Sequence, residues 1–439
     1  MDPRWLPAHG VLAAVLPASA RTFRAGDESL AQTLAGSGAT PGERSPDVEV
    51  ATAAAALTGD APCAIVFALA TPGEGAGVAG RLTARLGGVA RVAAAAAEAR
   101  RRARALGYPA VEVIPFDQPR RAWLGPPRPA DLRALPLGAV VAARRDTGPT
   151  ILEAAGAAAG EPFGREAARV GQAGVVLVAG AERVLRCVLK AGDAQIAAPL
   201  AFLARLRDAA PPAAVAERIA WSVGGGELAL ARWSVEPRLA GVPASSPGGA
   251  FLDDCVEFLA ALFAVALDDE PAPLAAAGEL VAAACPPDLA RRVTAIAAAL
   301  DDQLAGVPRG VAHGDFWPEN LLAADGRLSG VVDWSAARAG ALPLLDLWHL
   351  LAHAEPAARE RPLGDAVVGR LLPAAERGGG PLVAAYCQRI GLSPEPPLLR
   401  ALAVAYWLEH VAGDLRAYAD RRARPAWLAR NVHAVAAAL

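Results

Sequence analysis

Four polar side chains of types that serve phosphoryl transfer follow one another within a short apolar stretch of the chain. Apolar residues flank them, such as Leu321 and Leu322 or Val331 and Val332. Short apolar strands would be buried and would hold the polar groups at the edge of a packed scaffold. Phosphoryl transfer needs a carboxylate that accepts the proton of the attacking hydroxyl, and oxygen ligands for Mg²⁺. The stretch supplies both kinds of group, in His313, Asp315, Asn320 and Asp333.

Asp and Asn beside apolar runs also serve as helix caps and turn residues. For any one of these side chains, that plain structural interpretation is the better one. The complete set, with its order and spacing, favours a catalytic site instead.

The spacing of this set resembles a known motif. His313-Gly-Asp315, four residues, Asn320, and then an apolar strand that ends in Asp333 are similar to the Brenner-type motif of the aminoglycoside phosphotransferase and choline kinase family, which has a protein-kinase-like fold. The resemblance covers about residues 150–439 and is strong only from 310 to 350. Ser335 stands where the family often has Glu.

The resemblance implies a role for each matched position. Asp315 would be the catalytic base, and Asn320 and Asp333 would bind Mg²⁺. His313 would brace the loop, and Asp346 matches a later Asp that supports the catalytic loop in the family.

Lys190 is a second candidate for contact with phosphate. It is the only lysine in the chain, because the other 42 of the 43 basic residues are arginine. The fold that the resemblance implies needs a lysine on a strand here, where a compact charge contacts the α- and β-phosphates of ATP and Arg is not equivalent. Arg186 shares the face of the same expected strand and is the alternative. No Glu follows in the next helix, where Asp193 is the only nearby acid.

Three further patterns have a plain structural interpretation beside a functional one. Gly171-Gln-Ala-Gly174 could cover the phosphates, and a simple turn explains it equally well. The run from Gly75 to Gly80 has the spacing of a dinucleotide-binding loop, but a glycine-rich turn is the better explanation. His349 and His353 lie one helical turn apart and could hold a metal, yet no third ligand accompanies them, which favours packed histidines.

The order of the expected elements predicts an α+β fold. A small α/β domain of unknown role, with a Rossmann-like domain as the alternative, is expected over residues 1–140, with strands at 63–70 and 110–116 and a helix at 91–106. An antiparallel sheet lobe at 150–240 should contain a hairpin at 175–190, a helix at 195–208 and strands at 218–223 and 227–235. A helical lobe at 241–439 should contain helices at 251–267, 273–285 and 289–304, with a break at 378–380. A mobile loop is expected at 36–47 and a connector at 115–136.

The composition excludes several classes of protein. The net charge is −2, so no basic excess points to a nucleic-acid partner. No uncharged apolar run reaches about 18 residues, so we expect no membrane span. The five cysteines are far apart without a CxxC pair and indicate buried thiols in a reducing, cytoplasmic setting. The run from Gly10 to Leu16 ends like a signal peptide but is short, and we do not expect cleavage.

These patterns together predict an ATP- and Mg²⁺-dependent small-molecule kinase that phosphorylates a hydroxyl group. One alternative is a kinase-fold nucleotide-binding module with little or no catalysis, which the missing helix Glu favours. Another is a bifunctional chain whose first domain binds a nucleotide or S-adenosylmethionine.

Overall fold

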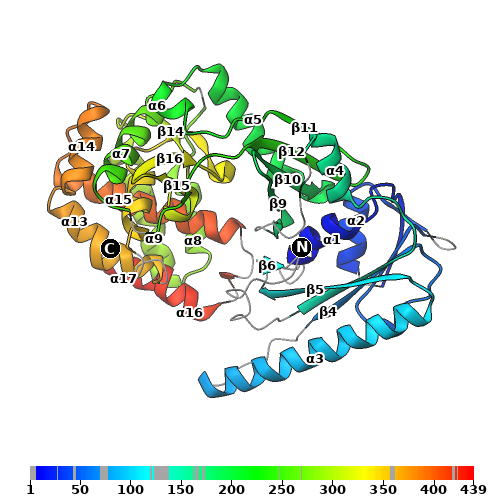
Figure 1. The fold of residues 1–439 in the computed structure, drawn as a ribbon. Coiled ribbons are helices and arrows are strands. Elements are labelled where there is room, and N and C mark those ends of the chain that lie inside the picture. The colour runs from blue at the N-terminus through cyan, green and yellow to red at the C-terminus, as the bar shows by residue number, and fades with distance from the viewer. Residues whose placement is uncertain are drawn as a thin grey trace. The chain divides into compact units, whose positions relative to one another are not determined.

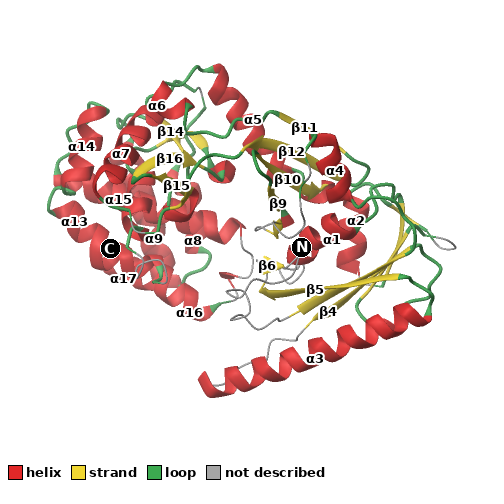
Figure 2. Ribbon diagram, viewed as in Figure 1, coloured by secondary structure: helices red, strands yellow, loops and turns green. Residues whose placement is uncertain are grey.

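The structure is a computed structural model. It describes residues 6–439 except for 27, 43–45, 70–77, 119–120, 123–137, 162, 164–167, 171–173, 246, 268, 356–360, 418–420 and 423. The chain forms two compact units. The first consists of residues 1–198 and 221–238, and the second of residues 199–220 and 239–439. The strands of the first unit and the helices of the second are distinguished in Figure 2, and the α+β class is confirmed.

The described residues of the first unit include a seven-stranded sheet with the order β2-β1-β3-β4-β7-β5-β6. Strands β1 to β4 are parallel to one another, and β7 pairs antiparallel with both β4 and β5. The strands are β1 (Thr22–Ala25), β2 (Thr40–Pro41), β3 (Val48–Ala51), β4 (Cys63–Leu69), β5 (Ala110–Gln118), β6 (Arg121–Ala122) and β7 (Gly138–Arg144).

Helix α3 (Val78–Ala105) connects β4 to β5 and lies along one face of this sheet (Figure 1). Its buried residues Val92, Ala96, Ala99 and Ala103 recur every three to four positions, which places them on one helical face. Small side chains let the helix pack closely on β4 and β7. The predicted strand–helix–strand pattern is confirmed, with β7 inserted between its two strands.

Helices α1 (Leu6–Val15), α2 (Glu28–Gly36) and α4 (Ile151–Ala159) contribute to the other core of this unit. That core joins apolar residues of the large sheet, such as Ile65, to residues of the small sheet, such as Leu185 and Val235. The signal-like run of the sequence lies in α1, and its residues 11–16 are fully buried there. Residue 140 falls inside β7. The division into three domains therefore stays a prediction.

The small sheet of the first unit has the order β11-β12-β10-β9-β8 and is antiparallel. Its strands are β8 (Ala168–Val170), β9 (Val176–Ala179), β10 (Arg183–Leu189), β11 (Gly224–Glu227) and β12 (Ala231–Pro237). The predicted hairpin and the helix α5 (Ala194–Asp208) are confirmed.

The strand expected at 218–223 was wrong, because the strand that precedes β12 is β11, which the glycines Gly224 to Gly226 form together with Glu227. A Cβ on Gly225 would lie 2.9 Å from the carbonyl oxygen of Trp233. Glycine therefore allows β11 to approach β12 closely, which is a known use of glycine in strands.

The described part of the second unit is mostly helical. The three helices expected before the motif are confirmed, with bounds that differ from the expected ones by at most four residues, and the break at Gly378–Gly380 lies between α13 and α14. The helices are α6 (Ala213–Ala216), α7 (Gly249–Phe263), α8 (Leu274–Ala282), α9 (Pro287–Leu304), α10 (Leu345–His353), α12 (Leu363–Ala366), α13 (Leu372–Glu376), α14 (Pro381–Arg389), α15 (Pro396–Ala417), α16 (Pro425–Leu428) and α17 (Ala434–Ala438).

Short strands interrupt these helices around the motif. Strands β13 (Val242–Pro243), β15 (Leu321–Ala324) and β16 (Arg327–Val331) form one sheet, and β14 (Gly310–Ala312) pairs with β17 (Arg338–Ala341). Of the regions expected to be loops, 36–47 contains β2, and 115–136 contains the end of β5 and β6, while much of the rest lies outside the described residues. Among the described helices, none combines the length and apolar character needed to cross a bilayer.

Candidate functional site

The motif loop begins where β14 ends, and a side chain of α10 holds its backbone. The carboxylate of Asp346, in the first turn of α10, accepts hydrogen bonds from the backbone N–H of His313 at 2.7 Å and of Gly314 at 2.8 Å. Each carboxylate oxygen thus holds one of two successive peptide groups. A bidentate contact of this kind fixes the orientation of the loop.

His313 is fully buried and connects the two parts of the motif. Its Nδ1 accepts a hydrogen bond from the Asp315 N–H at 3.3 Å, so its Nε2 carries the proton and donates to the Val332 carbonyl oxygen at 3.1 Å. The ring packs edge-on against Trp334, with 4.7 Å between the ring centroids. These contacts place the imidazole between the loop and the strand that leads to Asp333.

Gly314 has a backbone conformation and surroundings that only glycine tolerates. Its φ is +83°, and a Cβ would lie 2.2 Å from the Ala336 carbonyl oxygen. The motif requires glycine here because the loop passes directly over the turn that follows Asp333.

Asp315 is partly exposed, and each of its carboxylate oxygens accepts one hydrogen bond. Asn320 Nδ2 donates to Oδ2 at 2.9 Å and also to the Asp315 backbone oxygen. His349 Nε2 lies 3.2 Å from Oδ1. Burial raises the pKa of the Asp315 carboxyl, but the hydrogen bond that His349 donates, together with the electrostatic influence of the neighbouring histidines, outweighs burial and lowers the pKa to about 2. The carboxylate is therefore ionised at neutral pH, as a proton acceptor must be.

Asn320 and Asp333 are brought together by the hairpin of β15 and β16. Leu321 pairs with Val331, and the Val332 N–H donates to the Asn320 carbonyl oxygen at 2.9 Å. Asp333 follows with a left-handed φ of +64°. Among the described residues, neither the Asn320 amide oxygen nor the Asp333 carboxylate accepts a hydrogen bond. Free oxygen donors of this type fit Mg²⁺, which prefers oxygen ligands and retains several waters.

A group of aromatic side chains lies beside Asp315, and the sequence interpretation treated two of them, His349 and His353, as packed histidines. His349 of α10 contacts Asp315 and also Tyr406 of α15, and the rings of His353 and His410 lie against it. The pair His349 and His353 forms no metal cluster, since the described residues contain no group of three His, Cys, Asp or Glu side chains able to hold a metal. The contact of His349 with Asp315 was missed because 34 residues separate the two in sequence, and no local spacing reports it.

Of the two cationic candidates, Arg186 lies in the small sheet of the first unit and Lys190 lies directly after its strand β10. Lys190 follows β10, which ends at Leu189, and its Nζ pairs with the Glu227 carboxylate at 3.1 Å. Arg186 lies inside β10 and pairs with Glu236 of β12 at 2.9 Å. The acid beside Lys190 thus comes from β11 and not from the following helix. Asp193, the acid that the sequence offered, pairs with Arg232.

The glycine-rich candidates are only partly described. Gly174 has a φ of +80° and precedes β9. Gly171 lies outside the described residues, as does the start of the run from Gly75 to Gly80. Neither phosphate-covering role is tested.

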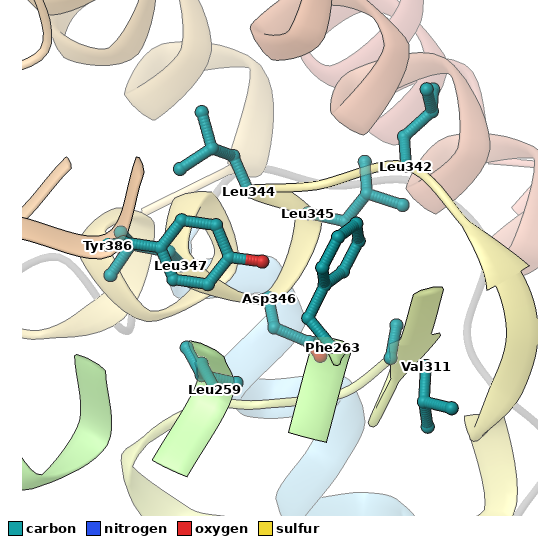
Figure 3. A pocket seen from close by; sticks show the side chains of 10 residues that line it. Leu259, Phe263, Val311, Leu342, Leu344, Leu345, Asp346, Leu347 and Tyr386 are labelled. Atoms are coloured by element: carbon teal, nitrogen blue, oxygen red, sulfur yellow. The ribbon is translucent and has the colours of Figure 1, made fainter. Parts of the chain in front are cut away.

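A small pocket is lined by residues of α7, β14, α10 and α14 (Figure 3). Apolar side chains such as Leu259, Phe263 and Val311 line it together with Asp346. Tyr386 also lines the pocket; burial raises the pKa of its hydroxyl far above the ordinary value, although a hydrogen bond that its oxygen accepts from the backbone of Leu344 partly offsets this. Most of the lining residues are apolar, as in a packed core, and they surround the Asp346 carboxylate that holds the motif loop.

The cysteines are free thiols, and four of the five are buried. Burial raises the pKa of Cys63 and of Cys187 to about 12. The prediction of buried thiols is confirmed for Cys63, Cys187, Cys255 and Cys387, while Cys285 is partly exposed.

The motif and its surroundings define a phosphotransferase of the protein-kinase-like class. Residues 164–382 match the model of the phosphotransferase enzyme family that includes the aminoglycoside phosphotransferases, and this part of the chain belongs to that family. None of the curated proteins is significantly similar to the chain in sequence.

Three solved structures illustrate the structural similarity. Aminoglycoside phosphotransferase APH(2'')-Ib with bound ADP is 13% identical, with 62% of this chain and 89% of that chain covered and a TM-score of 0.42. Macrolide 2'-phosphotransferase MphH from Brachybacterium faecium is 16% identical, with 65% and 96% covered and a TM-score of 0.41. APH(3'')-Id from Streptomyces rimosus, in complex with ADP and streptomycin, is 17% identical, with 54% and 90% covered and a TM-score of 0.37. Because these TM-scores are low, the assignment rests on the family model.

Proposed function

We propose that the protein is an ATP- and Mg²⁺-dependent kinase that transfers a phosphoryl group to a hydroxyl of a small molecule. The observation that carries the proposal is the arrangement at Asp315. The carboxylate is ionised, each oxygen has one hydrogen-bond donor, and 36% of the side chain is exposed.

Asp315 accepts the proton of the acceptor hydroxyl while the hydroxyl oxygen forms a bond to the γ-phosphorus of ATP, and the bond from that phosphorus to the bridging oxygen breaks so that ADP leaves. His313 and Asp346 keep the loop in place during this step. Asn320 and Asp333 would hold Mg²⁺, which neutralises charge on the phosphates when it is bound. Lys190 would contact the phosphates of ATP, with Arg186 as the alternative and Gly171 and Gly174 as candidates to cover them.

A nucleotide-binding module without catalysis is the second candidate. The observation in its favour is that the acid paired with Lys190 does not come from the following helix, where the family resemblance implies a Glu. The partner is instead Glu227 of β11, whose side chain is half-exposed. A lysine that is held only by an exposed acid would still bind phosphate. The two proposals therefore differ in turnover and not in binding.

The variant Asp315→Asn separates them. We expect the rate of ADP formation with Mg²⁺-ATP and a panel of amino sugars, choline, homoserine and simple sugars to fall by about 10²- to 10⁴-fold, the usual contribution of a general base. Binding of Mg²⁺-ATP, followed by thermal shift, should persist. Binding without turnover in the wild-type protein would favour the module.

A nucleotide or S-adenosylmethionine site in the first 140 residues remains a separate proposal, and the glycine-rich run before α3 is its only support. Because one core joins the large and small sheets, the test uses the full chain. Gly75→Ala in the full chain should weaken S-adenosylmethionine or NAD binding in calorimetry. Unchanged heats in the variant would reject the site.

A further inference from the structure

Three side chains from three separate elements form a continuous hydrogen-bonded line that ends at Asp315. Asp315 lies in the motif loop, His349 in α10 and Tyr406 in α15. His349 Nε2 lies 3.2 Å from Asp315 Oδ1, and His349 Nδ1 lies 2.8 Å from the Tyr406 hydroxyl oxygen. His349 and Tyr406 are both buried, with 4% and 3% of their surface exposed.

The chemistry of the end members indicates the direction of these hydrogen bonds. An ionised carboxylate only accepts, so the Nε2–H of His349 donates to Asp315. Burial raises the pKa of Tyr406 well above its ordinary value, and the carboxylate of Asp315 adds to this effect. The phenol therefore keeps its proton and donates to Nδ1. This arrangement needs no charge on the imidazole.

The groups around His349 hold its ring in position. The ring of His410 lies 4.5 Å away at an angle of 33°, and the ring of His353 lies 4.9 Å away at 69°. Burial lowers the pKa of His410 well below its ordinary value. His410 is thus neutral, and Arg338 on β17 is neutralised by Glu409 of α15.

The line complements the contact that Asn320 makes on the other carboxylate oxygen. Asn320 donates to Oδ2 and His349 to Oδ1, so the plane of the carboxylate is fixed from both sides. A carboxylate that is held by only one of these donors could rotate about its last bond. A base must be held within a fraction of an ångström of its working position.

We propose that His349, supported by Tyr406, is a positioning residue that orients the Asp315 carboxylate toward the acceptor hydroxyl. The inference rests on the proposed function of Asp315. His349 keeps its own proton throughout and does not touch the acceptor. Its removal should therefore slow the chemical step and leave nucleotide binding unchanged.

The first test observes the hydrogen bond directly and needs no substrate. In the full chain labelled with ¹⁵N-histidine, NMR at pH 7.5 should show a protonated Nε2 on His349, and its signals should move in Asp315→Asn and in Tyr406→Phe. An Nε2 of His349 without a proton would overturn the proposal, because such a nitrogen cannot donate to a carboxylate. This result stands whether or not the protein is a kinase.

The second test measures Mg²⁺-ATP hydrolysis with water as the acceptor. His349→Phe should lower kcat by about 10- to 100-fold, as loss of a supporting hydrogen bond does at other sites, with KM for ATP within about twofold of wild type. His349→Gln, whose amide N–H can donate, should recover most of this loss. His433→Gln is the matched control, because His433 bonds the Ala284 carbonyl oxygen instead and should keep full activity.

The outcomes distinguish the positioning role of His349 from the proposed function of Asp315. Wild-type kcat in His349→Phe, or a Gln variant no better than Phe, would overturn the positioning role. Equal hydrolysis by wild type and Asp315→Asn would instead reject the proposed function. The NMR result would then test only whether His349 donates a hydrogen bond to Asp315.

Discussion

Asp315 and Lys190 are the two candidates for phosphate chemistry, and they are held in different ways. The carboxylate of Asp315 accepts hydrogen bonds from Asn320 of its own loop and from His349 of α10. The buried Tyr406 of α15 in turn forms a hydrogen bond with His349. Lys190 is held by Glu227, whose side chain is 51% exposed. Exposed ion pairs are weak and are screened by salt. The difference teaches that the expected base is oriented before any ligand binds, whereas the lysine can exchange its acid for a phosphate at little cost.

The largest effect should come from adding a side chain at Gly314, in the loop that carries Asp315. In Gly314→Ala, the added Cβ would press on the Ala336 carbonyl oxygen at a positive φ, and we expect a loss of stability of about 2–4 kcal/mol. Urea unfolding measures it.

Gly326→Ala is the matched control for this variant. Gly326 also has a positive φ, of +74°, but nothing lies within 4 Å of an added Cβ. It should lose only about 1 kcal/mol, because strain alone remains. Equal losses in the two variants would contradict the close approach at the motif loop.

The next effect concerns the lysine side of the comparison. Lys190→Ala should weaken binding of Mg²⁺-ATP by about 10- to 100-fold, the size of a lost charge-assisted contact, and leave the unfolding midpoint almost unchanged. Calorimetric titration measures the binding.

Arg186→Ala and Arg238→Ala complete the set of variants. Arg238 bonds the Gly180 carbonyl oxygen at an exposed position and serves as the control. A greater loss of affinity in Arg186→Ala than in Lys190→Ala would assign the phosphate contact to Arg186.

A smaller effect should come from the support of β16, the strand that leads to Asp333. The buried carboxylate of Asp254 in α7 accepts the Leu328 N–H at 3.1 Å. Asp254→Ala leaves that donor without an acceptor and should cost about 1–3 kcal/mol at pH 7.

The pH dependence of this contribution follows from the pKa. The hydrogen bond from Arg327 lowers the pKa of Asp254 below 3.8, although burial opposes it. The stabilisation is therefore complete above the unfolded pKa and is lost as pH falls through the lower folded value. The difference between wild type and variant should shrink below about pH 4. A difference that is the same at pH 3 and pH 7 would contradict this.

The smallest effect concerns the thiols. Cys63 and Cys187 are buried and have a raised pKa, so neither should react with a thiol reagent in the native protein within minutes. Cys285, which is partly exposed, should react first. All five should react after unfolding, and fast native labelling of Cys63 would contradict the burial.

The sequence predicted short apolar strands beside the motif residues because that information is local. The order from His313 to Asp333 lies within one loop and one hairpin, whose apolar flanks and polar tips are read directly from spacing. The sequence did not reveal β7 between β4 and β5, because strand neighbours are set by long-range pairing. The strand of Gly224 to Gly226 was hidden for another reason, since glycine favours turns unless a partner strand approaches closely. The line from Asp315 to His349 and Tyr406 depends on the packing of α10 on α15, which no local pattern reports.

The central claim is that Asp315 is the base of a phosphotransferase. The most direct test is ADP formation from Mg²⁺-ATP by wild type and by Asp315→Asn, measured in parallel with ATP affinity. The account predicts acceptor-dependent turnover in wild type, a loss of at least about 10² in the variant and unchanged affinity. Equal turnover by the two proteins would contradict it.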